Sequence, residues 1–112
     1  SQVGEYTKIG DRVMLHIRIQ LNGSGNTLTA NPLTIAGLPF ANGSAQTIST
    51  FVHWSFFSAS YMVVGATLAT GATTLAVTGL TAANASSGAA INSNALSATL
   101  GATVNLQMHY RV

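Results

Sequence analysis

Glu5 and Asp11 are the only carboxylate side chains in the sequence, so they form the only pair that could do acid–base chemistry. Glycoside hydrolysis usually needs two carboxylates about 5–9.5 Å apart, and a hairpin between these two could bring them together. Lys8 and Arg12 lie beside them, however, which is typical of a small surface charge cluster. We therefore predict that the chain is not an enzyme.

Three histidines, His16, His53 and His109, are the other groups with chemical potential. A Ser-His-Asp arrangement with Asp11 is formally possible, but no serine sits in the sequence context of a nucleophile elbow. If three copies of the chain assembled around a threefold axis, one histidine from each would give a three-imidazole metal site. Ordinary polar-face or interface histidines are the favoured reading, so we predict no metal and no cofactor.

Charge is scarce and confined to the two ends of the chain. The sequence has four basic and two acidic residues, 5% charged, whereas a typical domain has about 25%. Residues 19–110 contain no Asp, Glu, Lys or Arg. Four basic residues cannot supply the many phosphate contacts of nucleic-acid binding, and a partner recognised through hydroxyl, amide and aromatic groups is expected instead. Cysteine is absent, which excludes disulfides and thiolate metal sites.

Two segments show the strict alternation of a strand with one buried face. Residues 12–21 place Val13, Leu15 and Ile17 on one side, and residues 103–112 repeat the pattern. A Gly at the first position of Gly10-Asp11, Gly71-Ala72 and Gly101-Ala102 suits a two-residue type II′ hairpin. The expected strands are residues 3–9, 12–21, 27–35, 46–54, 60–69, 73–78, 96–100 and 103–112.

These short strands predict one all-β domain over residues 1–112, an antiparallel, jelly-roll-like β-sandwich of about eight strands. Residues 81–94 are small and polar and are expected to form a long surface loop, mobile or functional. The longest apolar run, residues 61–69, is half of the roughly 18 residues of a membrane span, so no membrane insertion is expected. Residues 51–57 and 61–69 carry apolar side chains on both faces, which favours cover by another copy of the chain; a thick core under a loop is the alternative.

The N-terminal third resembles a known family of viral proteins. Residues 3–12, VGEYTKIGDR, followed by an alternating strand, are similar to a G-x-Y-x-[K/R]-x-G-[N/D]-x-V pattern, and residues 33–41, LTIAGLPFA, to an L-x-I-x-G-L-P-F element. With the ending MHYRV, they resemble the C-terminal domains of bacteriophage tail fibres and tailspikes. The resemblance covers the first 41 residues and the last ten or so, while residues 46–95 share only their strand-rich composition.

The resemblance implies a homotrimer at the distal tip of a virion fibre, outside cells, as the C-terminal part of a longer chain. There it would bind a bacterial surface polysaccharide or lipopolysaccharide, with threefold multivalency strengthening weak sites. A structural trimerisation module without a ligand is the alternative. Exposed aromatic rings and neutral hydrogen-bonding groups suit sugar binding. The candidate ligand-binding residues are therefore Trp54, Tyr61, Tyr6, Asn84, Asn92 and Asn94, with burial in the core or interface as the alternative for Trp54.

Overall fold

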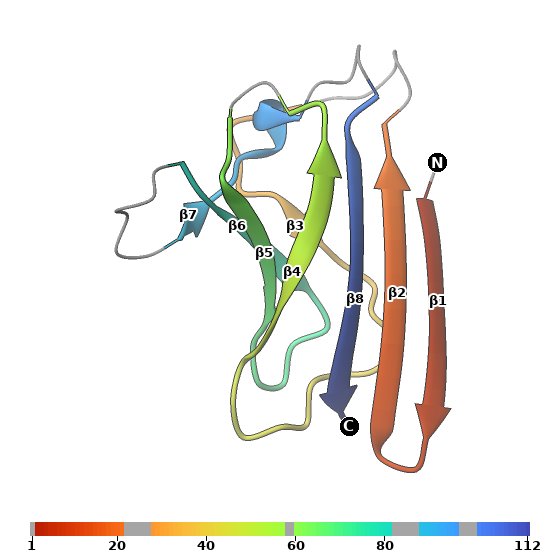
Figure 1. Ribbon diagram of the computed structural model, residues 1–112. Coiled ribbons are helices and arrows are strands. Elements are labelled where there is room, and N and C mark those ends of the chain that lie inside the picture. Colours follow the sequence, from red (N-terminus) through yellow and green to blue (C-terminus); the bar gives the residue numbers. More distant parts are fainter. Residues whose placement is uncertain (1, 22–27, 58–59, 82–87, 97–100) are drawn as a thin grey trace.

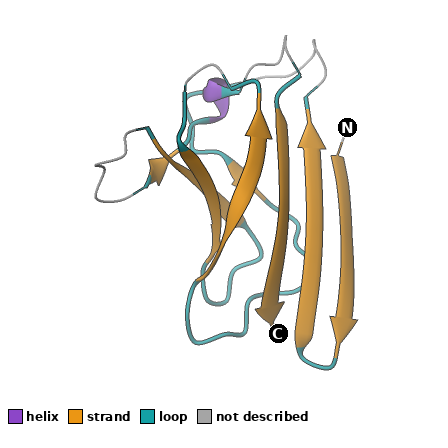
Figure 2. Ribbon diagram, in the orientation of Figure 1, coloured by secondary structure: helices purple, strands orange, loops and turns teal. Residues whose placement is uncertain are grey.

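The computed structural model describes residues 2–21, 28–57, 60–81, 88–96 and 101–112. The strands are β1 (Gln2–Ile9), β2 (Arg12–Gln20), β3 (Thr34–Ile35), β4 (Ile48–Ser55), β5 (Val63–Leu68), β6 (Leu75–Leu80), β7 (Ala89–Ala90) and β8 (Thr103–Arg111), with a short 3₁₀ helix η1 (Ser93–Ala95) before β8 (Figures 1 and 2).

All eight strands belong to one curled antiparallel sheet, in the order β1-β2-β8-β4-β5-β6-β3, with β7 paired to β6. The C-terminal half of β4 pairs with β8 over Val52–Ser55, and its N-terminal half pairs with β5 over Ile48–Phe51. β4 therefore connects the strands β1, β2 and β8 to the strands β5, β6 and β3 within the same sheet (Figure 1). The expectation of an all-β, antiparallel chain of eight strands is confirmed.

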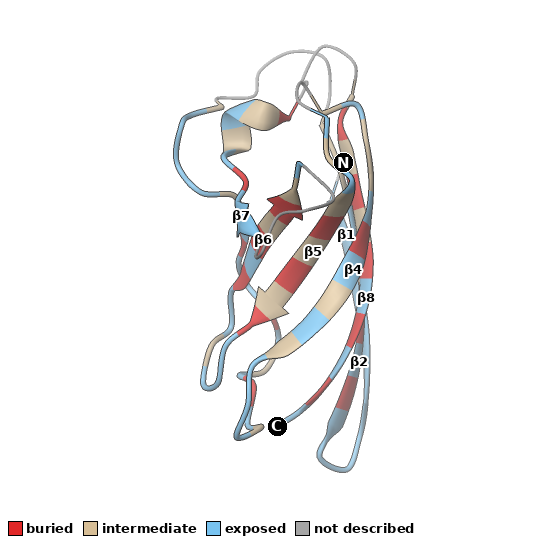
Figure 3. Cartoon of the chain, turned by 60° about the vertical axis from the view of Figure 1, so that its left-hand side comes forward, coloured by how far each residue is buried: buried red, intermediate tan, exposed pale blue. Residues whose placement is uncertain are grey.

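The sheet curls because its strands alternate apolar and polar residues, and the apolar sides meet on the concave face. In β2, Val13, Leu15 and Ile17 are buried while Met14 and Arg18 are exposed. Figure 3 shows the same stripes along β5 and β8, where buried and less buried residues follow each other. The alternation predicted for residues 12–21 is confirmed as far as Arg18, and the alternation predicted for residues 104–112 is confirmed as far as Tyr110. Residues 19–21 are all half-buried, and Val112, expected on the buried face, is 46% exposed.

The core lies between β2 and β8 on one side and β5 and β6 on the other. Its members are at most 8% exposed; they come from β2, β3, β4, β5, β6 and β8 and from connecting segments, and none comes from β1. The largest fully buried side chains are Leu68, Leu75, Ile91, Met108, Val13, Val64, Val77 and Asn42. All of them except Asn42 are apolar.

The hairpin predicted at Gly10-Asp11 is confirmed. Ile9 pairs with Arg12, so the two residues between them form the whole loop. Gly10 has φ +60° and Asp11 has a negative φ, which is the combination of a type II′ turn. A side chain at Gly10 would strain this backbone, because left-handed φ values disfavour L residues other than glycine.

β5 and β6 form the hairpin predicted around Gly71-Ala72, but the predicted two-residue type II′ turn is wrong. Residues 69–74 connect β5 to β6, and the Ala72 backbone N–H donates to the Ala69 carbonyl at 3.1 Å. Gly71, at φ +75°, is the third residue of that turn, which is the glycine position of a type II turn. The glycine signal marked a turn correctly but misplaced it by one residue.

Three other expected elements differ from the structure or fall partly outside the residues that it describes. The strand expected over 27–35 is only Thr34–Ile35 in the described residues. Of the strand expected over 96–100, only Leu96 is described, and it forms a bridge with Phe57. The loop expected over 81–94 contains β7 and the start of η1, because Ala89 and Ala90 pair with β6, while residues 82–87 lie outside the description.

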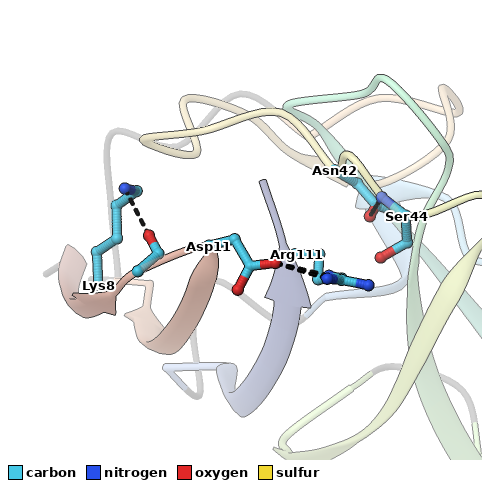
Figure 4. Close-up of polar contacts among 6 residues, drawn as sticks. Lys8, Asp11, Asn42, Ser44 and Arg111 are labelled. Carbon is cyan, nitrogen blue, oxygen red and sulfur yellow. Dashed lines mark hydrogen bonds and ion pairs between the residues drawn. The ribbon is translucent and has the colours of Figure 1, made fainter.

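Asn42 joins three parts of the chain at the lower end of the sheet. Its side-chain amide donates to the carbonyls of Leu68 at 3.0 Å and Gln46 at 3.2 Å. Its Oδ1 accepts the Ser44 N–H at 2.9 Å, which closes an Asx turn (Figure 4). With 1% exposure, Asn42 is the buried polar residue of the described core, and all its side-chain groups are satisfied.

One ion pair joins the β1–β2 turn to the end of β8. The Asp11 carboxylate accepts from Arg111 Nε at 2.9 Å and lies 2.7 Å from its Nη2 (Figure 4). This hydrogen bond, followed by the charge of the guanidinium, lowers the pKa of Asp11 below its usual value. Both side chains are more than half exposed, so the pair is a surface contact.

We expect the Asp11 carboxyl to titrate at a lower pH than an ordinary aspartate, measured by ¹³C NMR. Because its pKa is lower in the folded state, the contact stabilises the fold above the unfolded-state pKa and is lost as the pH falls through the folded-state pKa. Arg111→Gln should return the midpoint toward the usual value, while Arg12→Gln should move it less. An unchanged midpoint in Arg111→Gln would mean that this pair does not form in solution.

Candidate functional site

Trp54 does not lie on an exposed face. It is half-buried and packs against the core, and its cross-strand partner on β8 is the buried Val104. Residues opposite each other in an antiparallel pair share a face, so Trp54 points to the concave side of the sheet. This is the core placement that the sequence left open as the alternative for Trp54.

Tyr61 and Tyr6 have different surroundings. Tyr61 is half-buried, its ring meets Phe57 edge-to-face with centroids 5.9 Å apart, and it covers the backbone of Gly79. Tyr6 is 54% exposed and meets the Phe40 ring edge-to-face at 5.7 Å. It lines a cleft of about 410 Å³ between β1, β2 and the segment after β3. Tyr6 is thus the predicted aromatic residue that remains open to a ligand.

The predicted asparagines do not gather around these rings. Asn92 is exposed, and its backbone bridges to Pro32, while the backbone N–H of Asn94 donates to Thr29. Asn84 lies outside the described residues. Of four clefts on the described part of the surface, Tyr6 lines two, whereas Trp54, Tyr61, Asn92 and Asn94 line none of the four.

A different aromatic side chain is exposed at the rim of a groove. Phe51 of β4 is 81% exposed and lies at a groove of about 460 Å³ on the convex side of β4, β5 and β6. We call this the outer groove. It is lined by Ser49, Thr50, Phe51, Val63, Gly65, Ala66, Thr67, Thr78, Gly79, Leu80 and Gly88.

The strand register explains the shape of the outer groove. Phe51 pairs with Gly65, and Gly65 pairs with Thr78 on β6. Gly65 has no side chain, so the floor between Phe51 and Thr78 is backbone. A Cβ at Gly65 would lie 3.3 Å from the Thr50 carbonyl, so even alanine would fit tightly here. The glycine therefore keeps the groove open beside the phenylalanine ring.

The chemistry of the outer groove is neutral. Its polar groups are the hydroxyls of Ser49, Thr67 and Thr78 and nearby backbone, while the Thr50 hydroxyl donates to the Gln107 carbonyl at 2.7 Å; none of the lining residues carries a charge. An apolar ring beside hydroxyl groups offers stacking and neutral hydrogen bonding in one place. A volume between about 300 and 1,000 Å³ is typical of small-ligand sites. The groove suits an uncharged, hydroxyl-rich ligand.

Imidazole and amide groups continue along the convex face toward β1. His16 Nε2 and Asn105 Oδ1 share a hydrogen bond at 2.9 Å, and His53 pairs with Asn105 across β4 and β8. A smaller cleft of about 180 Å³ lies beside His16, Gln107 and His109. His16 and His109 thus face outward, as their positions on the polar faces of two strands predicted.

A signal for Phe51 was present in the sequence of β4. One face of this strand carries Ile48, Thr50, Val52 and Trp54, and the other carries Ser49, Phe51, His53 and Ser55. The first face is the more apolar one and is the one that points to the core. The signal is weak, because each face carries one aromatic residue, so alternation alone does not choose between Phe51 and Trp54.

No group of three His, Asp or Glu side chains in the described residues is placed to hold a metal ion. Within the same residues, no helix has the length and apolar character needed to cross a membrane.

The comparisons with known proteins give no further assignment. No family model matches the chain, and no curated protein and no solved structure matches it.

Proposed function

We propose that this chain is a non-catalytic tip domain of a phage tail fibre or tailspike that binds a neutral glycan on a bacterial surface. The ligand would be a surface polysaccharide or the sugar part of lipopolysaccharide. The outer groove is the binding site, and the curled sheet serves as a jelly-roll-like sandwich that holds it. One observation carries the proposal: Phe51, 81% exposed, lies in a groove whose lining residues are all uncharged.

The lack of charge in the long middle of the chain supports the same proposal. Residues 19–110 have no acidic or basic side chain, so recognition there depends on hydroxyl, amide, imidazole and aromatic groups. Such contacts are individually weak, and a homotrimer would strengthen them by presenting three grooves on one particle. The resemblance of residues 3–12 and 33–41 to phage tail proteins supports the trimer and the virion location.

We expect Phe51→Ala to weaken polysaccharide binding at least ten-fold, which corresponds to about 1.4 kcal/mol per site. The measurement is binding of the purified chain to immobilised bacterial polysaccharides of defined composition. Phe56→Ala is the matched control, because Phe56 is also an exposed phenylalanine, at 56%, but does not line the outer groove. Equal binding by the two variants, or no binding by the unmodified chain to any polysaccharide, would contradict the proposal.

A structural trimerisation module is the second candidate, favoured by exposed apolar side chains in the middle of the chain. Phe51, Phe56 and Met62 are each more than half exposed. If Phe51→Ala converts a trimer into monomers and the unmodified chain binds no polysaccharide, the groove is a subunit interface and this second function holds.

A further inference from the structure

β1 is an unblocked edge strand. It ends the strand order of the sheet, and no described strand pairs with its second side (Figure 1). All eight of its residues are exposed, and its register with β2 runs without a break from Gln2 to Ile9. Natural edge strands are often protected from pairing by proline, bulges, short length or charged side chains. β1 has eight residues without a proline or a bulge, and Glu5 and Lys8 are its two charged residues. It therefore presents a template for another strand.

The hairpin determines which backbone groups of β1 are available. Ile9 and Arg12 flank the two-residue loop, so they form a hydrogen-bonded pair. Bonded and non-bonded pairs alternate along an antiparallel ladder, so the odd-numbered residues of β1 bond to β2. The N–H and C=O groups of Gln2, Gly4, Tyr6 and Lys8 therefore point to the free edge. A second antiparallel strand must pair with these even-numbered residues.

The apolar side chains of β1 are arranged symmetrically about Tyr6. Val3 is 49% exposed, Tyr6 54% and Ile9 71%. If a second copy of β1 lies antiparallel with its Tyr6 opposite Tyr6, then Val3 lies opposite Ile9 of that copy, and Ile9 opposite its Val3. Val3 and Ile9 point to the same face of the sheet, so the apolar side chains meet in two equivalent pairs.

The remaining residues of β1 also find suitable partners in this register. Lys8 lies opposite Gly4, where nothing stands within 4 Å of an added Cβ, so the lysine stem has room. Glu5 lies opposite Thr7, whose hydroxyl can donate to the carboxylate. Other registers fit less well. One centred on Glu5 sets two carboxylates against each other, and one centred on Thr7 places Ile9 opposite Glu5.

Space is available where the second Tyr6 would lie. The cleft of about 410 Å³ borders β1 on the concave side, and Gly4, Tyr6, Ile35 and Leu38 are among its lining residues. Tyr6 points to this side, because its partner on β2 is the buried Leu15. The tyrosine of a paired copy would point to the same side and could bury its ring against this cleft.

We propose that β1 pairs with β1 of a second copy of this chain, antiparallel and centred on Tyr6, so that the two sheets become continuous. A twofold contact of this kind is isologous, the commonest arrangement in homo-oligomers. It goes beyond the function proposed above and is independent of the threefold contact. It joins single chains into dimers, or trimers into pairs of trimers, and thus gives particles with an even number of chains.

Tyr6→Pro tests the contact, because it removes an edge-facing N–H without removing a bond to β2. We expect analytical ultracentrifugation of the unmodified chain to show particles with an even number of chains. Tyr6→Pro should raise the dissociation constant of the β1–β1 contact at least ten-fold. Far-UV circular dichroism of both proteins checks that the sheet is retained. The proposal is overturned if the unmodified chain shows no even-numbered particle, or if Tyr6→Pro forms it with unchanged affinity.

A charge pair tests the register itself. Val3→Glu and Ile9→Lys should each weaken the association through β1, because each places a charge opposite an apolar residue. The double variant should recover most of the lost affinity, because the introduced carboxylate and ammonium then face each other at two equivalent places in the contact. Contacts of the new side chains with Arg18 and Arg12 are the same in single and double variants. If the double variant loses as much binding free energy as the two single variants together, the register centred on Tyr6 is overturned.

Discussion

Asn42→Ala is expected to lower the free energy of unfolding by about 2–4 kcal/mol, because it leaves buried backbone groups without partners. The substitution removes the donors to the Leu68 and Gln46 carbonyls and the acceptor for the Ser44 N–H. Each unpaired buried group costs about 1–3 kcal/mol, and water is expected to replace part of the loss at the two less buried contacts. Chemical denaturation at one fixed protein concentration measures the change.

The contacts of the Asn42 backbone explain why the whole lower end of the sheet should respond. Its N–H donates to the Ala72 carbonyl at 3.0 Å, and its carbonyl accepts from Gly71 at 2.7 Å. The next residue, Gly43, donates to the Arg111 carbonyl at 2.7 Å. The side chain thus holds a loop that touches both the β5–β6 turn and the end of β8.

Two variants separate this effect from a general sensitivity of the loop. Ser44→Ala keeps the backbone N–H that Asn42 accepts and should change stability by less than about 0.5 kcal/mol. Asn42→Asp keeps the acceptor but loses both donors, and its carboxylate would face two carbonyl oxygens. It should be at least as destabilising as alanine near neutral pH. If Asn42→Ala unfolds no more easily than Ser44→Ala, the Asn42 contacts contribute little to stability.

Leu68→Ala is expected to lower the free energy of unfolding by about 2–5 kcal/mol. Leu68 is fully buried and pairs across the sheet with Leu75, which is also fully buried. Truncation removes buried apolar surface and leaves a cavity that the strands on both sides cannot fill without moving. Denaturant midpoint and slope give the change, with a constant slope indicating that the same fold unfolds.

Leu80→Ala is the matched control for Leu68→Ala. Leu80 belongs to the neighbouring strand β6 but is only half-buried and lines the outer groove. Its truncation removes less buried surface and leaves space that is already open to water, so we expect a loss below about 1 kcal/mol. Equal losses in the two variants would mean that the concave face is not the core of the folded protein.

The strands that sequence analysis located best are those whose two faces differ most in polarity. In β2 and β8, every inward residue over 13–17 and 104–110 is apolar and buried, and the outward residues are polar or partly exposed. The pattern is local, because successive side chains of a strand point to opposite faces whatever its neighbours are. β4 has an aromatic residue on each face, so the same rule gave no single choice between Phe51 and Trp54.

Short elements and turn positions were less predictable from the sequence. β3 and β7 have two residues each, and their pairing depends on β6, which lies far away in the sequence. The Gly71 turn shows a related limit of local reasoning. A glycine signals positive φ but does not say which position of the turn it takes; the hydrogen bond from Ala72 to Ala69 decides that.

The sequence by itself determined the all-β class, the main strands, the Gly10 hairpin and the absence of charge over residues 19–110. These properties follow from composition and from side-chain alternation with a period of two, which each strand carries alone. Only the tertiary structure decided which face of β4 turns to the core, that Phe51 meets Gly65 and Thr78 in one groove, and that β1 has a free edge. Those outcomes depend on which strands become neighbours, and neighbours are chosen by the burial of apolar faces contributed by distant parts of the chain.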